Sequence, residues 1–567
     1  MSTKKPEILA PAGSYDAMTA AVYAGADAVY LGSTLFNARM NAKNFTREDI
    51  KNAVEFCHKR GVKVYVTINT AITDKQIRDA MLLVQYLYKT GVDALIVADL
   101  GLASEIHKYF PDFPLHASTQ ASGHSSHSAK YLKDIGFSRM VIARETSKKD
   151  LALAASNSPI ELEVFVHGAL CVSCSGQCLF SSIVGGRSGN RGECAQPCRL
   201  PYNSRYPLSL KDLSLANHIT ELTEMGIDSL KIEGRMKSPD YVYAVTKVFR
   251  ALVDENRNAT ESEMKYLEGI FSRSGFTDGY FTGIKDKNML GMRCEGERIP
   301  SVDKTDCTPE REEIVIPERN HNLDTDFTDT YKIKRELPEG FKPQRSALFL
   351  NPEVIPEKKY TDYFDVIYMT PENFDPAKAN GVIFPPTVYD SEYESVKSKL
   401  LNAKKKGAIH ALVGNVGQLS LARECGFIIH GDYRLNIYSN PSAKLFEDLD
   451  ELVLSPELLL AQARDINAKK SIMVYGRIPL MTLEKPAETS VLTDRKKISF
   501  PIIEISGSDI VFNSVPTYMA DKMDMIRAIG KTGEFFLFST EGKREIENTI
   551  DSYRKGYTTK REIRRMK

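Results

Sequence analysis

The 567-residue sequence has almost no net charge, no long hydrophobic run and no export signal. Its 75 Lys and Arg residues balance 74 Asp and Glu residues, so RNA or a membrane would have to be recognised by a local patch rather than by a global field. No apolar run approaches the roughly 18–20 residues of a membrane span. The N-terminal MSTKKPEILAPAGS lacks the apolar segment of a secretory signal. We therefore expect a cytoplasmic protein with no membrane partner.

Familiar hydrolase motifs are also absent from the sequence. It contains neither HExxH nor GxSxG, and no pair of carboxylates has a spacing that indicates a water-activating dyad. These absences argue against the common zinc-peptidase and serine-hydrolase sites.

The nine cysteines are spread unevenly along the chain. Five of them fall within 28 residues: Cys171, Cys174, Cys178, Cys194 and Cys198. Disulfides are disfavoured in a protein without an export signal, so a local cluster of this kind predicts metal or redox chemistry.

Short apolar runs recur through the first 235 residues, and most follow a Gly that fits a helix C-terminus. Strands that are apolar on both faces are typical of parallel sheets covered by helices. The eight runs are EILAP, GADAVYLG, GVKVYVTIN, GVDALIVADLG, PLHAS, GFSRMVIARE, ELEVFVH and GIDSLKIEGR. Eight βα units of this total length predict an α/β fold with an N-terminal TIM-like (β/α)8 barrel. A doubly wound open sheet is the alternative.

Polar residues follow strand after strand, where a TIM barrel places its chemistry. Each one alone could simply cap the next helix. Taken together they predict a polar pocket at one rim, formed by Asn69, Asp99, Ser118, Gln120, Arg144, Glu145, His167, Glu233 and Arg235. Arg144 and Arg235 would hold carboxylates or phosphates. Glu145, Glu233 and His167 would carry protons, and the amide and hydroxyl side chains would contact the substrate.

The second half of the chain repeats the plan of the first. The stretch from Val97 is echoed from Val413 in the order of its strands and helices, and His167-Gly168 corresponds to Tyr475-Gly476. The copy has no cysteine cluster. We therefore predict a second α/β barrel-like unit that is structural or substrate-binding.

These patterns divide the chain into five parts. Residues 1–255 form the barrel with a Cys-rich insertion at 168–205, and residues 256–296 add a helix and a Gly/aromatic loop that packs on it. Residues 297–345 are charge-rich and contain several prolines, which indicates a linker. Residues 346–552 form the second unit. The basic run 553–567 is either a solvated end or a phosphate contact.

The Cys-rich insertion allows three kinds of site. Cys171 and Cys178 are spaced C-x6-C, Cys194 and Cys198 are spaced C-x3-C, and a Gly-rich stretch of 15 residues separates the pairs. Four thiolates can hold an iron–sulfur cluster or zinc, and the spacing favours the cluster. A catalytic pair of Cys171 with His167 is the third possibility. Arg199 and Tyr202, which follow the cysteines, would clamp or stack on a nucleotide.

The segment EVFVHGALCVSCSGQCLFS resembles the signature of the peptidase U32 family, the collagenase-like proteases. PEILAPAGS, NARMNAKNF, GNRGECAQPCR, KIEGRMKSPDYV and FSRSGFTDGYFTG are similar to its other blocks, in the same order across residues 6–290. Segments such as HGDYRLNIYSN and YGRIPLM are similar to the C-terminal extension of longer members. The resemblance implies a 4Fe–4S cluster held by Cys171, Cys178, Cys194 and Cys198, with Cys174 unmatched.

The activity that the resemblance implies is oxygen-independent hydroxylation of an RNA base, either an rRNA cytidine or a tRNA uridine, with a prephenate-linked oxygen source. Two alternatives remain open at this point. One is a U32 peptidase, and the other is a non-catalytic RNA-binding or assembly factor with a structural cluster.

Overall fold

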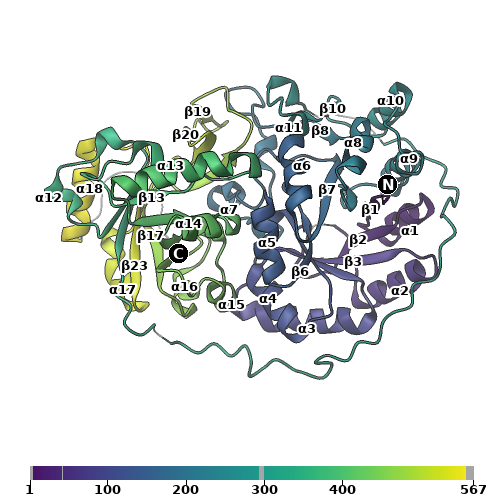
Figure 1. The fold of residues 1–567 in the computed structure, drawn as a ribbon, viewed down its shortest axis with the longest axis horizontal. Coiled ribbons are helices and arrows are strands. Elements are labelled where there is room, and N and C mark those ends of the chain that lie inside the picture. The colour runs from purple at the N-terminus through teal and green to yellow at the C-terminus, as the bar shows by residue number, and fades with distance from the viewer. Residues whose placement is uncertain (1–3, 41, 293–298, 337, 557–567) are drawn as a thin grey trace. The chain divides into compact units, whose positions relative to one another are not determined.

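A computed structural model describes residues 4–40, 42–292, 299–336 and 338–556 (Figure 1). Its contacts divide the chain into two compact units. Unit 1 comprises Met1–Ala71, Arg78–Gly176 and Arg187–Phe327, and unit 2 comprises Ile72–Ile77, Gln177–Gly186 and Thr328–Lys567. Within the described ranges, no helix combines the length and the apolar character that crossing a membrane requires.

Unit 1 is a closed barrel of eight parallel strands, as the sequence predicts. The last strand of the barrel, β9, pairs with both β1 and β7 and so closes the sheet. A short additional strand, β8 (Asp212–Ser214), runs antiparallel to the end of β7. The barrel strands are β1 (Glu7–Pro11), β2 (Ala28–Gly32), β3 (Lys63–Ile68), β4 (Ala94–Val97), β5 (Leu115–Ala117), β6 (Phe137–Val141), β7 (Glu161–Gly168) and β9 (Ser229–Ile232).

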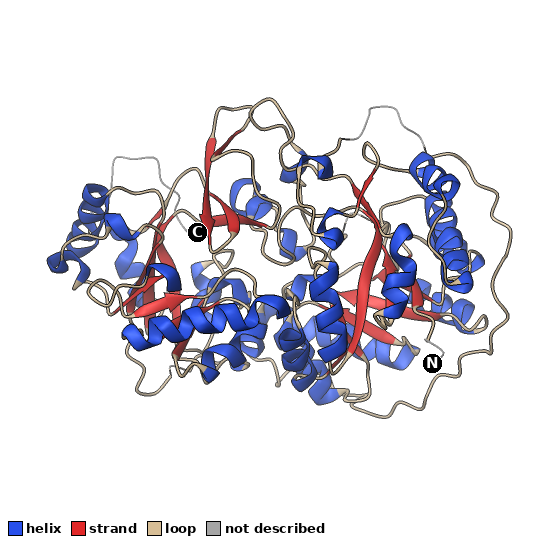
Figure 2. Ribbon diagram, turned by 45° about the horizontal axis from the view of Figure 1, so that its top comes forward, coloured by secondary structure: helices blue, strands red, loops and turns tan. Residues whose placement is uncertain are grey.

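Helices surround this barrel, and their ends follow local sequence signals. The Ser14 side chain accepts a hydrogen bond from Ala17 N and begins α1, and Gly25 follows that helix with a φ of 92°, which suits glycine. Figure 2 shows helices around the strands of each unit. The helices of the barrel are α1 (Tyr15–Tyr23), α2 (Arg47–His58), α3 (Asp74–Thr90), α4 (Leu100–Tyr109), α5 (Ser126–Asp134), α6 (Lys148–Asn157), α8 (Ile219–Glu224) and α9 (Pro239–Glu255).

The stretch predicted as a linker, 297–345, packs closely on unit 1 over much of its length. Its described residues before β11 (Arg345–Phe349) form neither helix nor strand. Cys307 N donates to Tyr23 O at 2.7 Å, Arg311 pairs with Asp27 at 2.6 Å, and Phe327 is 1% exposed. Residues 302–327 are therefore held in place by contacts with residues far away in the sequence. Before this stretch come α10 (Glu261–Ile270), β10 (Phe276–Thr277) and α11 (Gly279–Thr282).

Unit 2 contains a second closed barrel of eight parallel strands, which confirms the predicted repeat. β17 pairs with both β16 and β23, and β23 pairs with β11. The strands are β11 (Arg345–Phe349), β12 (Val366–Met369), β13 (Gly381–Ile383), β14 (His410–Val413), β15 (Ile428–Gly431), β16 (Glu451–Val453), β17 (Lys470–Gly476) and β23 (Thr532–Phe538). The helices are α12 (Lys358–Thr361), α13 (Tyr393–Lys406), α14 (Leu419–Glu424), α15 (Asn440–Lys444), α16 (Leu460–Asp465), α17 (Met523–Ala528) and α18 (Lys543–Lys555).

A small antiparallel sheet contributes apolar side chains to the core of unit 2. It consists of β18 (Pro479–Leu483), β19 (Val491–Thr493), β20 (Ser499–Ile505) and β21 (Ser508–Phe512). Ile510 and Phe512 join barrel residues such as Phe535 in one apolar cluster. Leu179 also belongs to this cluster, and its N–H donates to Leu480 O at 2.8 Å. The middle of the Cys-rich insertion, including α7 (Phe180–Gly185), is therefore part of unit 2.

The predicted basic tail begins inside a helix. Tyr553 belongs to α18, is 3% exposed, and donates its hydroxyl to Val474 O at 2.6 Å. The boundary at residue 553 thus falls within the packed part of unit 2. The rest of the basic run, 557–567, lies outside the described residues.

Candidate functional site at the mouth of the first barrel

Arg235 is held at the C-terminal end of the unit 1 barrel by three polar side chains. Its guanidinium donates to Thr67 Oγ1 at 3.2 Å, Asn44 Oδ1 at 2.6 Å and Asn37 Oδ1 at 3.3 Å. The side chain is 4% exposed, and burial lowers its pKa to about 10. Arg235 is therefore still a cation at neutral pH.

Glu233 is the carboxylate of this mouth. It is 8% exposed, with Oε1 at 3.5 Å from Arg39 Nη2 and Oε2 accepting from Ala169 N at 3.4 Å. Burial by itself would raise the pKa of Glu233, but the charges of Arg39, Arg144 and Lys237 outweigh it and lower the pKa below its usual value. Glu233 is ionised at neutral pH, so it can accept a proton.

Two more arginines give the mouth a cationic character. Arg144 lies over the Phe165 ring, with Cζ 4.1 Å from the centroid, and among the described residues its buried Nε has no hydrogen-bond partner. Burial would lower the pKa of Arg39, but Glu233 and the thiols of Cys194 and Cys171 raise it overall. The mouth is therefore suited to an anionic group.

His167 and Glu145, the other two predicted proton carriers, have surroundings that differ from those of Glu233. His167 is 1% exposed and packs against Phe249 and Phe276, with ring centroids 5.7 and 5.0 Å away. Burial lowers its pKa to about 3, so the ring is neutral. Its Nδ1 faces Ser214 Oγ at 3.4 Å. Glu145 is 3% exposed and is bonded to His124 and Ser175.

Of the side chains predicted to contact the substrate, some hold the backbone of a loop and others are available for binding. Asn69 Oδ1 accepts from Ala38 N at 2.9 Å, and Ser118 Oγ accepts from Gln120 N at 3.3 Å. Both therefore shape the backbone of a loop, which is the simpler of the two roles that the sequence allowed. Gln120 is partly exposed, and its buried Oε1 has no hydrogen-bond partner among the described residues.

Arg199 and Tyr202 hold the Cys-rich insertion together. Arg199 donates to Leu170 O at 2.8 Å and to Ser209 Oγ at 3.0 Å. Tyr202 is 3% exposed and donates its hydroxyl to Pro197 O at 3.1 Å. Stacking of Tyr202 on a nucleotide would require the loop to open, because its ring is buried.

Three cysteines of unit 1 are close neighbours. Burial raises the pKa of Cys194 and raises that of Cys198 to about 12, and the charge of Cys171 adds to both effects. Cys171 and Cys194 are exposed, whereas Cys174 is 1% exposed. Cys178 belongs to the segment Gln177–Gly186 of unit 2. Among the described residues no cysteine takes part in a disulfide, and no group of three or more His, Cys, Asp or Glu side chains is spaced to hold one metal ion.

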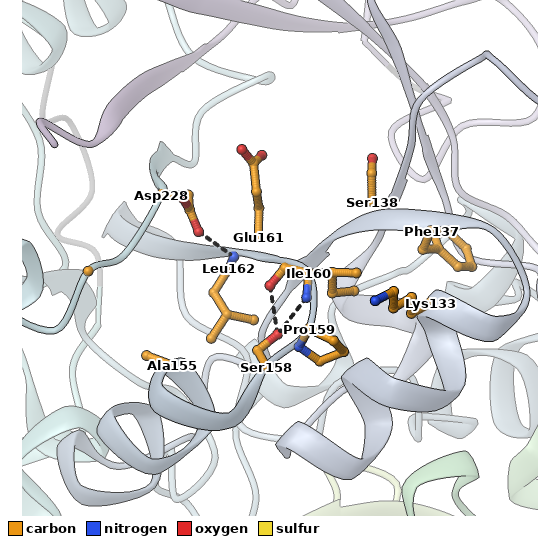
Figure 3. Close-up of a pocket in the computed structure, with 11 residues that line it drawn as sticks. Lys133, Phe137, Ser138, Ala155, Ser158, Pro159, Ile160, Glu161, Leu162 and Asp228 are labelled. Carbon is orange, nitrogen blue, oxygen red and sulfur yellow. Dashed lines mark hydrogen bonds between the residues drawn. The ribbon is translucent and has the colours of Figure 1, made fainter.

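A separate cavity of about 510 Å³ lies at the opposite end of the unit 1 barrel (Figure 3). It is lined where β6, β7 and β9 begin, by residues that include Lys133, Phe137, Glu161 and Asp228. Asp228 accepts from Leu162 N at 3.0 Å and so serves the local backbone. In TIM barrels the chemistry lies at the other end, where the strands finish.

Residues that no sequence pattern had marked complete the mouth. Asn37, Arg39 and Asn44 come from the segment NARMNAKNF, which follows β2 and supplies partners to both Glu233 and Arg235. The sequence showed this segment only as a block of the family resemblance. His124 is 1% exposed and bonded to Glu145.

Comparison with known proteins gives a consistent set of relatives. The model of peptidase family U32 matches residues 13–291. The chain is 40% identical over 265 residues to the 23S rRNA 5-hydroxycytidine C2501 synthase of Escherichia coli K12, a match covering 45% of this chain and 40% of that one. It is 39% identical over 269 residues to tRNA hydroxylation protein P1 of Bacillus subtilis, covering 44% and 64%. The match thus spans less than two thirds of either relative. An uncharacterized protease of Methanocaldococcus jannaschii is 35% identical over 318 residues, covering 51% and 76%.

Proposed function

The chain belongs to peptidase family U32, and from that premise we propose that it is an iron–sulfur enzyme that hydroxylates an RNA base without molecular oxygen. The observation that carries the proposal is the position of Arg39. Its guanidinium lies beside Glu233. It is also close enough to Cys171 and Cys194 for the charges of their sulfurs to raise its pKa. A cationic mouth next to a group of thiols brings an anion-binding site and a redox site together. The names of the two relatives that hydroxylate rRNA and tRNA support RNA as the substrate.

We propose a cluster rather than a single zinc ion because of the C-x6-C and C-x3-C spacing of the cysteines. Cys171 and Cys194 lie close enough to Cys198 for their charges to raise the pKa of its thiol. The N–H of Gln196 already donates to Cys194 Sγ at 3.3 Å, as amides around cluster sulfurs do. The family resemblance adds Cys178 as the fourth ligand. When bound, a 4Fe–4S cluster supplies electron transfer or an open iron site.

The arginines of the mouth would bind the anionic reactants. Arg235 uses its terminal nitrogens on Thr67, Asn37 and Asn44, so it shapes the wall of the mouth. Arg39 and Arg144 have donors left for the carboxylates of an oxygen source such as prephenate, or for an RNA phosphate. Glu233, held ionised between these cations, would be the proton acceptor of this mouth.

The target base has to enter the mouth unstacked. Taking a base out of a duplex costs a few kcal/mol, and the cost is lowest where the RNA is already single-stranded. We therefore expect a base in a loop to be the substrate. The chain's near-neutral charge leaves recognition to local contacts.

The test combines cofactor analysis with nucleoside analysis. Protein purified anaerobically should contain iron and sulfide, and RNA from a deletion strain should lack one hydroxylated base. Wild-type protein should restore the base, and Cys171→Ala should not. Stoichiometric zinc without sulfide, or RNA identical in both strains, would contradict the proposal. Cleavage of gelatin by the purified protein, abolished by Glu233→Gln, would instead support the peptidase alternative.

A further inference from the structure

The proposed reaction leaves one buried carboxylate at the rim of unit 1 without a role. Glu145 follows β6, and both of its oxygens are occupied. Oε1 is 2.8 Å from His124 Nε2 and accepts from Ser175 N at 2.7 Å, while Oε2 accepts from Ser175 Oγ at 3.0 Å. Ser175 directly follows Cys174 and lies four residues after Cys171. The carboxylate therefore reaches the loop that carries these two cysteines.

His124 completes a buried ion pair with Glu145. Its Nδ1 is 2.8 Å from Ser122 O, and its Nε2 faces the carboxylate. Both ring nitrogens thus face oxygen atoms, and although burial alone would raise the pKa of Glu145, its hydrogen bond and charge interaction with His124 help to lower it overall. His124 and Glu145 are 1% and 3% exposed. Truncating either side chain to alanine leaves the other without its partner, which loosens this part of the rim.

The loop is also held from its other side. Ser122 Oγ donates to Ser175 O at 2.6 Å, so both backbone polar groups of Ser175 are bonded to the rim. The next residue, Gly176, has a φ of 78°, and a Cβ there would overlap the carbonyl oxygen of Gln120. The backbone of the cysteine loop is therefore pressed against the turn that follows β5, with no space for a side chain between them.

We infer that Glu145 and His124 are a positioning pair, which locks the Cys171–Gly176 loop onto the rim and so sets where the thiol of Cys171, the one proposed cluster ligand in this loop, stands. The inference rests on the proposed function only in taking Cys171 as a cluster ligand. It gives Glu145 a role different from the proton carrier that the sequence suggested, because each oxygen is already engaged by the loop or by His124.

Two substitutions of Glu145 separate positioning from proton transfer. Glu145→Gln keeps the shape of the side chain and a carbonyl acceptor for Ser175 N. If the role is positioning, this variant should still hold the loop in large part. Glu145→Ala removes every contact with the loop. A proton carrier would give the opposite pattern, with Glu145→Gln inactive although its cluster is intact. Asp150→Ala is the matched control, because Asp150 is a buried carboxylate in the first turn of α6 that accepts from Ser147 Oγ at 2.6 Å.

The first measurement does not need a cluster. Full-length, metal-free protein would be treated with N-ethylmaleimide, and the alkylation rate of each cysteine would be followed by mass spectrometry. In Glu145→Ala, Cys174 should react about tenfold faster, because the loop opens locally once its charge-assisted hydrogen bonds are gone. Cys57, 0% exposed in α2, reports global unfolding and should not change. Ser122→Ala, which removes one hydroxyl contact, should show a smaller increase confined to Cys174.

Unchanged Cys174 reactivity, or parallel increases at Cys174 and Cys57 in both variants, would overturn the inference.

The second measurement uses anaerobically purified, iron-loaded protein and follows cluster absorbance after addition of a chelator. Glu145→Ala should lose iron about tenfold faster than wild type, with Glu145→Gln and Asp150→Ala close to wild type. If the protein binds no iron, the proposed function fails, and the alkylation experiment still decides whether the pair holds the loop. If Cys174 is alkylated faster in Glu145→Ala but the rate of iron loss is unchanged, the pair holds the loop without positioning the cluster ligand, and the inference is wrong.

Discussion

Arg235 occupies the space that a side chain at residue 32 would need, so the mouth of the first barrel depends on glycine at the end of β2. A Cβ on Gly32 would overlap Nη2 of Arg235. The same relationship recurs in unit 2, where a Cβ on Gly414, just after β14, would crowd the guanidinium of Arg434. Both barrels therefore combine a strand-end glycine with a buried arginine, although only the first has the cysteine cluster.

Gly32→Ala should displace Arg235 from Thr67, Asn37 and Asn44. We expect a loss of about 1–3 kcal/mol in the free energy of unfolding, as for other overpacked sites, together with a large loss of RNA hydroxylation. Urea denaturation and nucleoside analysis would measure the two effects. Gly269→Ala in α10 is the control, because nothing lies within 4 Å of a Cβ there. If Gly32→Ala and Gly269→Ala had the same free energy of unfolding and the same hydroxylation activity, Arg235 would not need this space.

Glu233→Gln should separate proton transfer from cofactor binding. Glu233 is the carboxylate held ionised by Arg39, Arg144 and Lys237, so its loss should lower the hydroxylation rate by about 10²–10⁴-fold while iron and sulfide stay at wild-type levels. Single-turnover kinetics would measure the rate. Asp228→Asn, at the opposite end of the barrel, should leave the rate unchanged. If Glu233→Gln hydroxylated RNA at the wild-type rate, Glu233 would have no role in proton transfer.

The stability of unit 2 should fall as the pH rises from about 4.5 to about 8. Burial raises the pKa of Glu451 from its ordinary value of 4.5 to about 8, with Asp450 and Asp365 adding to the effect. A carboxyl group with a raised pKa in the folded state stabilises it fully below the unfolded pKa, and this contribution is lost as the pH passes the folded pKa. Urea denaturation across this range should show the decline. It should be much weaker in Glu451→Gln, and an unchanged decline in that variant would assign the effect to other groups.

Leu179→Ala should destabilise unit 2 although residue 179 lies within the Cys-rich insertion. Leu179 is 5% exposed in the apolar cluster that contains Ile510, Phe512 and Phe535. Truncating a buried leucine costs about 2–5 kcal/mol, and proteolysis near residue 179 should become faster. Leu401→Ala, at a site 37% exposed in α13, is the control and should change little. Resistance to proteolysis equal to wild type would show that the segment is held by other contacts.

Deleting residues 557–567 should weaken RNA binding and flatten its dependence on salt. Each phosphate contact that is lost reduces the slope of affinity against salt by about one unit. The deletion should begin after Gly556, because Tyr553 is buried in unit 2 and bonded to Val474 O. Binding of an RNA fragment at several salt concentrations measures the slope. A slope equal to that of the full chain would assign recognition to other residues.

The sequence alone was sufficient to predict both barrels. Apolar runs after helix-ending glycines such as Gly25 determine buried parallel strands, because local conformation and burial act together there. The repeated order of elements then predicted the second barrel. Polar residues at strand ends were visible too, since a parallel barrel brings all these ends to one rim.

Only the tertiary structure decided what each of these polar residues does. Glu233 and Glu145 both follow a barrel strand, yet one meets Arg39 in the cationic mouth and the other meets His124 and the cysteine loop. These partners come from distant parts of the chain. Burial, which no local pattern reports, makes His167 a neutral ring. The sequence thus determined which strands form and where their ends meet, whereas long-range packing decided which side chains are buried, paired or left to bind a substrate.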